Sequence, residues 1–542
     1  MPNAKKTATP AKEHDLIVIG AGINGLGIAK DAAERGMSVV LVEQEDICFG
    51  VSAWSGRLIH GGLRYLEHMD LPLVRESLKE RERLFKLAPH LVKPVDLIMP
   101  FYKKNRRPAW MIWAGMMAYD FLSIDKTVPW HRILGKAKVK ARFKGMSDSG
   151  LGGAAVFIDG QVEYAERLCV ELALGASELG GEIRIHEKVV GFEFSNGRVV
   201  GVKTLSSSGE TSSIRGKAVI NAAGPWVDRV NDNLEQGSTK RLIGGTKGSH
   251  IIVDPFPGAP NDVIYYESQA DGRLVLVIPW MGRYLIGTTD TKFDLEPDAA
   301  RADQDEIEYL LSEVNALIPE SGLTRKDILY TYSGVRPLPY APGVSEWKIP
   351  RSHIVLDHTS DSLPGLYSVV GGKLTTFRQL AEDAVTMVLK KEFGERRACV
   401  NKQKMFPGAQ DTAWSNLKAD LVAGGAIKPD TAERLVALYG SRARLIASYV
   451  QKDPKLAERF DPRSPAIAAE LVVATQDEFA QTLTDIYARR ILLAFEPGHG
   501  LESVKRASEI VGKLNGWDKK LVAQNIKEYK VWLDHLKVPN VA

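Results

Sequence analysis

Residues 14–44, HDLIVIGAGINGLGIAKDAAERGMSVVLVEQ, decide the fold of this chain. Leu16–Ile19 is a short apolar run, which is typical of a strand in a parallel sheet that is covered on both faces. Helical periodicity follows from Ile23 to Arg35, and Val39–Val42 is a second apolar run of strand length. The order strand, helix, strand within about thirty residues predicts a βαβ unit, the first piece of an α/β domain.

Three glycines join the first predicted strand to the helix in the spacing G-x-G-x-x-G. Gly20 permits the tight turn, Gly22 lets the backbone approach a pyrophosphate, and Gly25 lets the helix pack against the strand. The N–H groups at the helix N-terminus would then hold the pyrophosphate. Glu43 ends the second strand, where it can bind the hydroxyl pair of a ribose and would repel a 2′-phosphate. The stretch therefore predicts a dinucleotide site and argues against NADP.

A second turn of small residues lies in residues 216–230, GKAVINAAGPWVDRV. The apolar run Ala218–Asn221 predicts another strand, which leads directly into Ala223, Gly224 and Trp226. Small residues at the end of a strand let a ligand come close to the backbone. We therefore expect this turn to meet the same nucleotide.

A third turn lies in residues 366–385, LYSVVGGKLTTFRQLAEDAV. A predicted strand leads into Gly371 and Gly372, and a helix is predicted to begin near Thr375. The N-terminus of a helix carries partial positive charge, and a favourable contact with it contributes roughly 0.3–1 kcal/mol. Such an end suits the anionic edge of a reduced flavin, so this turn favours FAD over NAD.

Residues 55–67, SGRLIHGGLRYLE, combine a glycine pair with cationic and aromatic side chains. His60, Arg64 and Tyr65 stand on either side of this pair, where side chains are absent. A solvated helix needs no glycine pair, and a buried strand does not favour arginine. We interpret the segment as backbone pressed against a flat ligand, with polar side chains directed at an anion.

The composition of the whole chain limits the alternatives. The chain has 542 residues, enough for two or three domains, with an ordinary globular content of 44% hydrophobic and 25% charged residues. Its net charge of +4 gives no reason to expect nucleic acid as a partner. Cys48, Cys169 and Cys399 are far apart, which argues against a disulfide framework, a zinc site or an iron–sulfur cluster. No run of about 18 apolar residues occurs, so no membrane-spanning helix is expected.

Ordered motifs over residues 15–385 resemble those of the FAD-dependent glycerol-3-phosphate dehydrogenases, the aerobic, respiratory, quinone-linked kind. The motifs are DLIVIGAGINGLGIAKDAAERG, RLIHGGLRYLE, RPAWMI, KGSHIIV, VIPW, IGTTDT, YSGVRPL and GGKLTTFRQLAEDA. Nearer the C-terminus, DIYARRILLAFE and GWDKK are more weakly similar. The resemblance implies FAD as the cofactor, oxidation of sn-glycerol 3-phosphate to dihydroxyacetone phosphate, and a membrane quinone as the electron acceptor.

The resemblance also implies a domain organisation: a glutathione-reductase-like FAD-binding Rossmann domain of α/β class, an inserted antiparallel-sheet substrate domain, and a helical C-terminal cap. We expect a disordered tail over residues 1–14, the FAD-binding domain over 15–95, 150–240 and 350–398, the substrate domain over 96–149 and 241–349, and the cap over 399–542. The amphipathic helices of the cap predict a covering or dimerisation surface, and hence a homodimer. Within the cap, two interpretations fit Arg489 and Arg490, a role in shaping the site and a surface ion pair, and we favour the ion pair.

The predicted active site must supply a base for a hydroxyl proton and cations for a phosphate. His250 is the candidate base, because a neutral imidazole suits that role. By the resemblance, Arg64 and Arg336 hold the phosphate or polarise the carbinol oxygen, Lys373 lies near the flavin pyrimidine, and Asp290 orients the site. Without the resemblance, His250 would be interpreted as a structural histidine and Arg336 as part of a surface salt bridge. The predicted catalytic residues are His250, Arg336 and Lys373, and the predicted substrate-binding residues are Arg64, Tyr65, Arg336, Lys373 and Thr289.

The predicted cofactor site draws on all of these glycine-rich turns. Its residues are Gly20, Gly22, Asn24, Gly25, Glu43, Ser52, Ser55, Leu58, His60, Gly61, Gly62, Val189, Ala223, Gly224, Trp226, Gly372, Lys373, Leu374 and Thr375. The segment around Gly61 is expected to line the isoalloxazine. The stretch GVSAWSGR has fewer hydroxyl groups than its counterparts in the family, so we expect fewer hydroxyl contacts to the flavin phosphates. No metal is expected, because the chain lacks a C-terminal cysteine cluster and a calcium-loop pattern.

Residues 102–122, YKKNRRPAWMIWAGMMAYDFL, place a basic cluster before an apolar run rich in aromatic residues. The run has about 13 residues, too short to span a bilayer but suited to a helix that lies in the headgroup layer. The alternative is a buried helix of the substrate domain. The resemblance favours the membrane and implies the cytoplasmic face of the inner membrane as the location. The predicted membrane contacts are Lys103, Lys104, Arg106, Arg107, Trp110 and Trp113.

Three rival functions fit parts of the same sequence. A flavin oxidase of amino acids or 2-hydroxy acids would bind a carboxylate with fewer cations. An oxidase of glycerol 3-phosphate would pass its electrons to oxygen, and a membrane-binding segment argues against it. A nucleotide-binding protein without catalysis would bind FAD but would show no reduction by a substrate.

Overall fold

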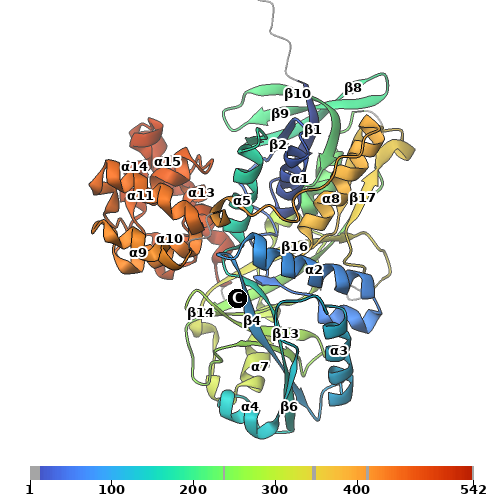
Figure 1. The fold of residues 1–542 in the computed structure, drawn as a ribbon, viewed down its shortest axis with the longest axis vertical. Coiled ribbons are helices and arrows are strands. Elements are labelled where there is room, and N and C mark those ends of the chain that lie inside the picture. The colour runs from blue at the N-terminus through green and yellow to red at the C-terminus, as the bar shows by residue number, and fades with distance from the viewer. Residues whose placement is uncertain (1–12, 236–238, 345–348, 411–413, 540–542) are drawn as a thin grey trace, which may run out of the picture.

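The computed structural model describes residues 13–235, 239–344, 349–410 and 414–539. Figure 1 shows three parts: a nucleotide-binding part built on one sheet, a second part built on another sheet, and a helical cap at one side of both. The predicted fold class, a Rossmann-type α/β domain with a mainly antiparallel second domain and helical C-terminal region, is confirmed.

The first sheet grows from the predicted βαβ unit. β1 (Glu13–Ile19) pairs in parallel with β2 (Val39–Val42) on one side and with β10 (Thr211–Asn221) on the other. β10 pairs in parallel with β18 (Leu366–Val370). The sheet also contains β7 (Glu182–Arg184), β8 (Glu187–Ser195), β9 (Arg198–Ser206) and β17 (Ile354–Asp357). Because β1, β10 and β18 are parallel neighbours, the three glycine-rich turns that follow them lie at the same edge of the sheet.

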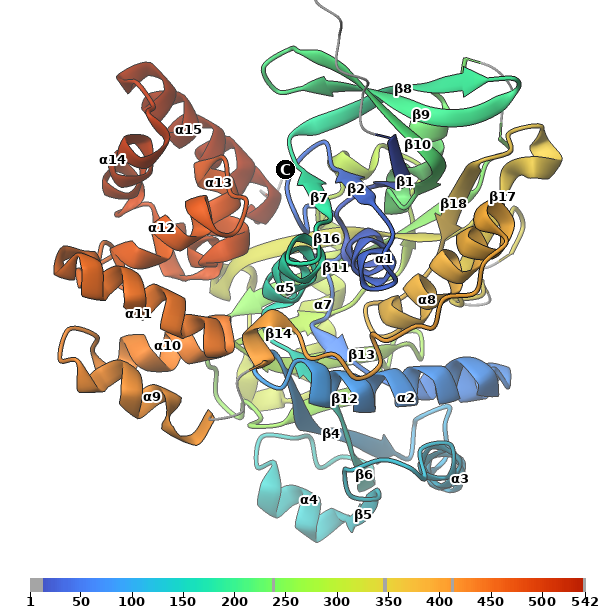
Figure 2. The same cartoon turned by 45° about the horizontal axis from the view of Figure 1, so that its top comes forward.

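Apolar side chains cover both faces of this sheet, as the continuous apolar run in β1 predicts. Leu16 and Val18 pack against the helices α1 (Ile23–Glu34), α5 (Ala165–Ser177) and α8 (Phe377–Val388). Ile17 and Ile19 point to the opposite face, where the β8–β9 hairpin closes over them (Figure 2). The helix after the third turn begins at Phe377, two residues later than the predicted start near Thr375, because Lys373–Thr376 form a turn first.

The second sheet is mainly antiparallel and lies beneath the first part in Figure 1. Its strands are β3 (Leu58–Ile59), β4 (Val92–Tyr102), β5 (Arg132–Gly135), β6 (Leu151–Val162), β11 (Ile243–Val253), β12 (Val263–Glu267), β13 (Leu274–Trp280), β14 (Arg283–Gly287), β15 (Thr291–Lys292) and β16 (Ile328–Pro339). The helices α4 (Lys136–Arg142) and α7 (Gln304–Leu317) pack their apolar side chains against one face. α2 (Leu71–Leu87) and α3 (Ala109–Phe121) lie beside the other part of the sheet.

The predicted domain boundaries differ from those of the sheets. β6 pairs along its length with β4 in the second sheet, so residues 92–95 and 151–162 do not belong to the FAD-binding sheet. The chain crosses between the sheets without a change of composition, which is why the sequence alone did not locate these crossings. β1 begins at Glu13, so residues 13 and 14 are strand rather than tail, and the rest of the predicted tail lies outside the described residues.

The cap follows the first two parts and consists of helices. They are α9 (Trp414–Ala423), α10 (Pro429–Tyr439), α11 (Ala443–Lys452), α12 (Ala468–Gln476), α13 (Leu483–Asp485), α14 (Val504–Asn515) and α15 (Lys519–Trp532). The expectation of a surface ion pair at Arg489 and Arg490 is wrong, because only 3% and 0% of these residues is exposed. Both side chains point into the junction with the first part, where they meet the carboxylate of Asp46.

Helix α3 combines a buried face with an exposed apolar face. Ile112, Met116 and Tyr119 are buried, whereas Trp110 and Trp113 are 68% and 53% exposed. Further exposed apolar residues follow at Phe121, Ile124, Trp130 and Ile133. The alternative of a buried helix thus holds for one stripe of α3, and contact of the exposed stripe with a membrane stays a prediction. Within the described ranges, no helix has the length and apolar content needed to cross a membrane.

One predicted membrane contact is incorrect. Arg107 is half-buried and donates hydrogen bonds to Glu67 and Glu267, which tie the start of α3 to the second sheet. Its charge is therefore already neutralised within the protein. Lys103, Lys104 and Arg106 are exposed beside the helix.

Candidate active site

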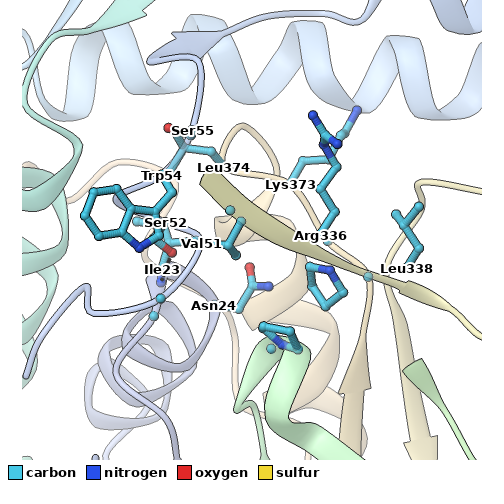
Figure 3. Close-up of a pocket in the computed structure, with 18 of the residues that line it drawn as sticks. Ile23, Asn24, Val51, Ser52, Trp54, Ser55, Arg336, Leu338, Lys373 and Leu374 are labelled. Carbon is cyan, nitrogen blue, oxygen red and sulfur yellow. Dashed lines mark hydrogen bonds between the residues drawn. The ribbon is translucent and has the colours of Figure 1, made fainter. Parts of the chain in front are cut away.

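A cavity of about 640 Å³ lies between the two sheets. Its walls come from the ends of β1 and β2, from the turns after β10 and β18, and from β13 and β16 of the second sheet. Figure 3 shows lining side chains, with Ser52 and Trp54 on one side and Arg336, Leu338 and Lys373 on the other. The carboxyl ends of parallel strands, where this cavity lies, are the usual ligand site of α/β sheets.

The nucleotide end of the cavity is built from glycines that cannot be replaced without a clash. Gly20 has a φ of +105°, and a Cβ there would lie 2.8 Å from the carbonyl oxygen of Ala222. A Cβ on Gly25 would lie 1.9 Å from the carbonyl oxygen of Gly20, so this glycine packs the helix against the turn. Gly372 has a φ of +89°, and a Cβ there would lie 2.8 Å from Nδ2 of Asn24. The first and third turns therefore meet at the start of α1, which leaves room for a ligand on backbone atoms.

Polar atoms at this end fit a dinucleotide. Ser52 Oγ accepts a hydrogen bond from Ile23 N over 3.0 Å, at the first residue of α1. The Oδ1 atom of Asn24 is buried and has no hydrogen-bond partner among the described residues. A buried acceptor without a partner is costly, and a bound ligand or water would satisfy it. The N-terminus of α1 adds partial positive charge, so the residues present suit the pyrophosphate of FAD.

Glu43 lies at the edge of the cavity where the ribose is predicted. Its Oε2 atom accepts from Ala21 N over 2.7 Å and its Oε1 atom from Glu45 N over 2.9 Å. Burial raises the pKa of Glu43 to about 7, against the effect of these two hydrogen bonds. The carboxyl group is thus fixed by backbone on one side and faces the cavity on the other.

The opposite end of the cavity gathers cations from separate elements. Arg64 comes from the short helix η1 (Leu63–His68), Arg336 from β16, Arg351 from the loop before β17, and Lys373 from the turn after β18. Arg336 Nη1 and Arg351 Nη2 donate to the two oxygens of Asp290, over 2.9 and 3.1 Å. One carboxylate is thereby shared between two guanidinium groups. The site carries more positive than negative charge.

Burial is the main cause that shifts the pKa values of these cations. Burial lowers the pKa of Arg336 and, together with neighbouring arginines, lowers that of Arg351 to about 10. Burial also lowers the pKa of Lys373. Burial alone would raise the pKa of Tyr65, but Lys373 and Arg64 outweigh it and lower that pKa instead. An anion that enters here would relieve the mutual repulsion of these cations.

Tyr65 lies between two of the cations. Arg64 Cζ is 5.4 Å and Lys373 Nζ is 4.6 Å from the centre of the Tyr65 ring. Lys373 Nζ also donates to Ser77 Oγ over 2.6 Å, which anchors the lysine to α2. The aromatic ring thus keeps the two cations at the cavity wall.

His250 lies on β11 with its ring packed against the neighbouring strands. A Cβ on Gly287 would lie 2.3 Å from the His250 ring, and the Tyr332 ring centre is 5.0 Å away. Its Nδ1 atom is buried and has no partner among the described residues. Burial and then Arg336 and Arg57 lower the pKa of His250 to about 3. The imidazole is therefore neutral at physiological pH, able to accept a proton.

Most of the predicted cofactor residues line the cavity. These are Gly20, Gly22, Asn24, Glu43, Ser52, Ser55, Leu58, His60, Val189, Ala223, Gly224, Trp226, Gly372, Lys373, Leu374 and Thr375. Gly25 does not reach the cavity, and its role is the helix–turn packing described above. His60 does line the cavity, where burial and the cations Lys373 and Arg64 lower its pKa to about 3.

The prediction that Gly61 and Gly62, the glycine pair after His60, line the cavity is wrong. A Cβ on Gly61 would lie 2.4 Å from the Tyr119 hydroxyl and 2.5 Å from Leu78, so this glycine lets α3 and α2 approach. Gly62 has a φ of +76° and begins the short helix that carries Arg64. The pair serves the packing that presents the arginine, and not the ligand directly.

Thr289 is also misplaced in the prediction. Its hydroxyl donates to Glu306 over 2.6 Å and accepts from Ser249 N over 2.8 Å, and the residue is 3% exposed. Its neighbour Thr288 lines the cavity instead and accepts from Arg336 Nη2 over 3.0 Å. A motif with two adjacent threonines does not by itself say which hydroxyl faces the ligand.

Among the lining residues that the sequence reasoning missed are Arg351, Thr288 and Tyr265. Arg351 belongs to no motif, and only the fold brings its loop beside Asp290. Tyr265 comes from β12, in a run of aromatic and apolar residues that looks like ordinary strand sequence. For Thr288 a signal existed, because it stands in the motif IGTTDT.

Two family models match the chain. Residues 15–378 match the model described as FAD dependent oxidoreductase, and residues 399–522 match that of the C-terminal domain of alpha-glycerophosphate oxidase. The glycerol-3-phosphate dehydrogenase of Synechocystis sp. is 42% identical, over 97% of each chain. The aerobic glycerol-3-phosphate dehydrogenase of Staphylococcus aureus is 33% identical, over 88% of this chain and 86% of that protein.

A solved structure gives the same fold. The glycerol-3-phosphate dehydrogenase of Bacillus halodurans, complexed with FAD, superimposes with a TM-score of 0.79 at 26% identity, over 97% of this chain and 95% of that chain. An L-alpha-glycerophosphate oxidase of Mycoplasma pneumoniae shares the fold more distantly, with a TM-score of 0.55 at 15% identity.

Proposed function

We propose that this chain, which belongs to the family of FAD-dependent glycerol-3-phosphate dehydrogenases, oxidises the secondary hydroxyl of sn-glycerol 3-phosphate to the ketone and delivers the electrons to a membrane quinone. Membership in that family makes the chain an FAD-dependent oxidoreductase, as the resemblance of its motifs implied. The product would be dihydroxyacetone phosphate.

The observation that carries the choice of substrate is the cation cluster of Arg64, Arg336, Arg351 and Lys373 around one carboxylate, Asp290. A phosphate monoester carries a charge of about −1.5 to −2 near neutral pH and offers three acceptor oxygens. Each charge-assisted hydrogen bond contributes about 1.5–3 kcal/mol, so two or three of them dominate binding. A single carboxylate would neutralise less of this charge, which favours a phosphate over an amino acid or a 2-hydroxy acid.

The residues at this end also account for the proton that the reaction releases. Bound FAD supplies the two-electron oxidant for the carbinol C–H bond. His250 is neutral and faces the cavity, so it can take the hydroxyl proton. Arg336 and its neighbours favour the alkoxide that develops at the same oxygen.

Burial, together with two cations, holds the pKa of His250 low, so a role as the base requires a factor that raises this pKa. Arg336 is one of the two cations that depress it. A phosphate dianion bound to Arg336 offsets that positive charge, so the pKa of His250 moves up toward its ordinary value when substrate binds. His250 is thus a weak base in the free protein and a stronger base in the complex, where it accepts the hydroxyl proton.

An anaerobic absorbance experiment tests this proposal. The purified protein is mixed with sn-glycerol 3-phosphate, with glycerol, and with L-lactate, and the visible flavin bands are followed. Bleaching by the phosphate ester alone supports the assignment, whereas bleaching by lactate or an amino acid would replace it with a carboxylate substrate. A flavin spectrum that no substrate changes would favour the binding protein without catalysis.

The electron acceptor is tested on the reduced protein from the same experiment. Rapid reoxidation by a soluble quinone analogue, with slow reoxidation by air, is the expected result. Fast reoxidation by air with release of peroxide would make the protein an oxidase. A second candidate is therefore the oxygen-using enzyme, since a related C-terminal domain carries that name.

The exposed apolar face of α3 supports a second part of the proposal, attachment to a membrane surface on the cytoplasmic face of the inner membrane. Trp110, Trp113 and Phe121 are more than half exposed, beside the exposed Lys103, Lys104 and Arg106. Aromatic side chains beside basic ones suit the headgroup layer of an anionic bilayer.

Vesicle flotation tests this attachment. The full chain should float with vesicles that contain anionic lipid and less with neutral ones. Replacement of Trp110 and Trp113 by Ser should release the protein, whereas Val531→Ser, an equally exposed apolar residue of the cap, should not. Equal flotation of both variants would assign the attachment to another surface. The homodimer stays a prediction.

A further inference from the structure

The cap contacts the loop that follows β2, at the nucleotide end of the cavity. This loop, residues 43–50 with the sequence EQEDICFG, lines the cavity with Glu43, Gln44, Phe49 and Gly50. It also carries three carboxyl groups within four residues, at positions 43, 45 and 46. Like charges this close repel one another, so the loop needs cations from elsewhere to hold one conformation.

Arg490 of the cap supplies the principal cation. Its Nη1 and Nη2 atoms donate to Oδ2 and Oδ1 of Asp46, each over 2.8 Å, and its Nε atom donates to the carbonyl oxygen of Glu478 over 2.8 Å. Arg490 is fully buried and Asp46 is 1% exposed. A bidentate pair of this kind fixes direction as well as distance. The two residues are 444 positions apart, so only the docked cap completes the pair.

Further cap groups hold the same loop. Arg489 Nη1 lies 3.6 Å from Asp46 Oδ2, and its guanidinium lies 5.4 Å from the centre of the Phe49 ring. Asp485 Oδ2 is 2.9 Å from His186 Nε2, and the backbone N–H of His186 donates to Glu45 O over 2.8 Å. The cap therefore reaches the loop at Asp46, at Phe49 and, through His186, at Glu45.

We infer that Arg490 is a positioning residue for FAD: through Asp46 it holds residues 43–50 in the conformation that binds the nucleotide, so the cap sets part of the affinity for the cofactor. This inference rests on the assignment of FAD to the cavity. Without Arg490, Asp46 loses its bidentate partner and keeps only the longer contact with Arg489 at 3.6 Å, so the loop is held less firmly. Glu43 and Phe49 would then leave the cavity wall together.

A second buried pair at the same junction provides a matched control. Arg167 of α5 donates through Nη1 and Nη2 to the two oxygens of Glu478 in the cap, over 2.6 and 2.8 Å, and both side chains are 0% exposed. This pair docks the cap on α5 and, among the described residues, makes no hydrogen bond to the 43–50 loop. Its loss tests the docking of the cap, because Glu478→Leu keeps the backbone carbonyl that accepts from Arg490 Nε.

The experiment replaces each pair as a unit by apolar residues, because removal of both partners leaves neither of them as an unpaired buried charge and the chain keeps its fold. In the loop variant, Arg489 keeps Asp485 at 3.9 Å as a partner. The loop variant is Asp46→Leu with Arg490→Met, and the control variant is Glu478→Leu with Arg167→Met. The dissociation constant for FAD is measured on the full chain after removal of the flavin, from the quenching of flavin fluorescence. We expect about tenfold weaker binding in the loop variant and less than about twofold change in the control.

Amide hydrogen exchange in the cap provides a second measurement. FAD would not change it if the pair of Asp46 and Arg490 had only a structural role. If the cap favours FAD, then FAD must favour the docked cap by the same factor. In the unaltered protein, FAD should slow amide hydrogen exchange over residues 483–490, and this effect should vanish in the loop variant but persist in the control.

The outcomes separate this inference from the proposed function. Equal FAD affinity in the loop variant and the unaltered protein, or an equal loss in both variants, would overturn the role of Arg490. Failure of the unaltered protein to bind FAD would instead overturn the assignment of the cavity. If the loop variant does not fold, Arg490→Lys, which keeps the charge but not the bidentate geometry, replaces it and is expected to weaken FAD binding while the protein stays folded.

Discussion

The two ends of the cavity bind charge by opposite means. The nucleotide end uses backbone atoms and groups that the protein itself fixes, such as Glu43, which accepts two backbone hydrogen bonds. The substrate end places several cations near the carboxylate of Asp290, and burial lowers the pKa values of Arg336, Arg351 and Lys373. At the first end a ligand meets a backbone shape that the protein fixes by itself, whereas at the second end an anion relieves the repulsion between cations.

This difference predicts how each end responds to substitution. At the substrate end, a lost cation weakens binding and catalysis but should not destabilise the free protein, because its neighbours gain from the reduced repulsion. At the nucleotide end, a changed residue distorts the backbone itself, so cofactor affinity and stability should fall together. Substitutions at both ends test this contrast.

Replacement of Arg336 by Met should lower kcat/KM for sn-glycerol 3-phosphate about 10³-fold, since two charge-assisted hydrogen bonds are lost at about 1.5–3 kcal/mol each. The melting temperature of the protein should stay unchanged or rise. Steady-state kinetics and thermal unfolding check both statements. A large fall in melting temperature would mean that Arg336 is a structural partner of Asp290, and the contrast between the two ends would fail.

Replacement of His250 by Asn should lower kcat about 10²-fold, the lower range for loss of a general base. The affinity for FAD should not change, because His250 lies at the substrate end. Pre-steady-state reduction of the flavin measures the step itself. A variant that reduces its flavin at the original rate would remove His250 as the base.

Gly20→Ala should weaken FAD binding about tenfold or more, because the φ of +105° and the contact of 2.8 Å with Ala222 O forbid a side chain without a shift of the turn. Its melting temperature should also fall. Gly36→Ala is the matched control, since Gly36 also has positive φ but nothing lies within 4 Å of the added Cβ. Equal loss of FAD in both variants would show that only backbone strain matters and not the closeness of the two turns.

The lowered pKa of His250 also predicts a dependence of stability on pH. The pKa of His250 is about 3 in the folded protein, and its ordinary value is 6.5. Between pH 3 and pH 6.5 the unfolded chain therefore binds a proton at this residue, whereas the folded protein does not. Stability is therefore fully present above pH 6.5 and is lost as the pH falls toward 3. At pH 5 this residue contributes a loss of about 1–2 kcal/mol. His250→Asn should accordingly lose less stability between pH 7 and pH 5 than the unaltered protein in chemical denaturation.

The variants Thr288→Val and Thr289→Val should distinguish the role of Thr288 at the cavity from the structural role of Thr289. Thr289→Val removes hydrogen bonds to Glu306 and Ser249, so it should cost about 1–3 kcal/mol of stability with KM nearly unchanged. Thr288→Val removes one partner of Arg336 at the cavity, so it should raise KM a few-fold, about what one net hydrogen bond contributes, and leave stability nearly unchanged. The reverse pattern would restore Thr289 to the substrate site.

Much of the fold followed from local sequence patterns. The βαβ unit, the two later strand-to-turn segments and the helical cap all appear where their periodicity predicted them, with ends displaced by a few residues. The positions of β4 and β6 did not follow, because an inserted domain shares its strands across crossings that have no compositional signal. The same holds for the cap residues Arg489 and Arg490, whose charge suggested a surface and whose partner, Asp46, is distant in sequence.

The first glycine-rich turn and the acid after the second strand could be located from the sequence, because consecutive residues with a fixed spacing form them. Gly20, Gly22 and Glu43 lie where a single short stretch places them. The substrate end and the cap junction follow only from the packing of distant segments. Arg351 reaches Asp290, and Arg490 reaches Asp46, from segments that no local pattern connects, because long-range electrostatic pairs depend on which surfaces the packed core brings together.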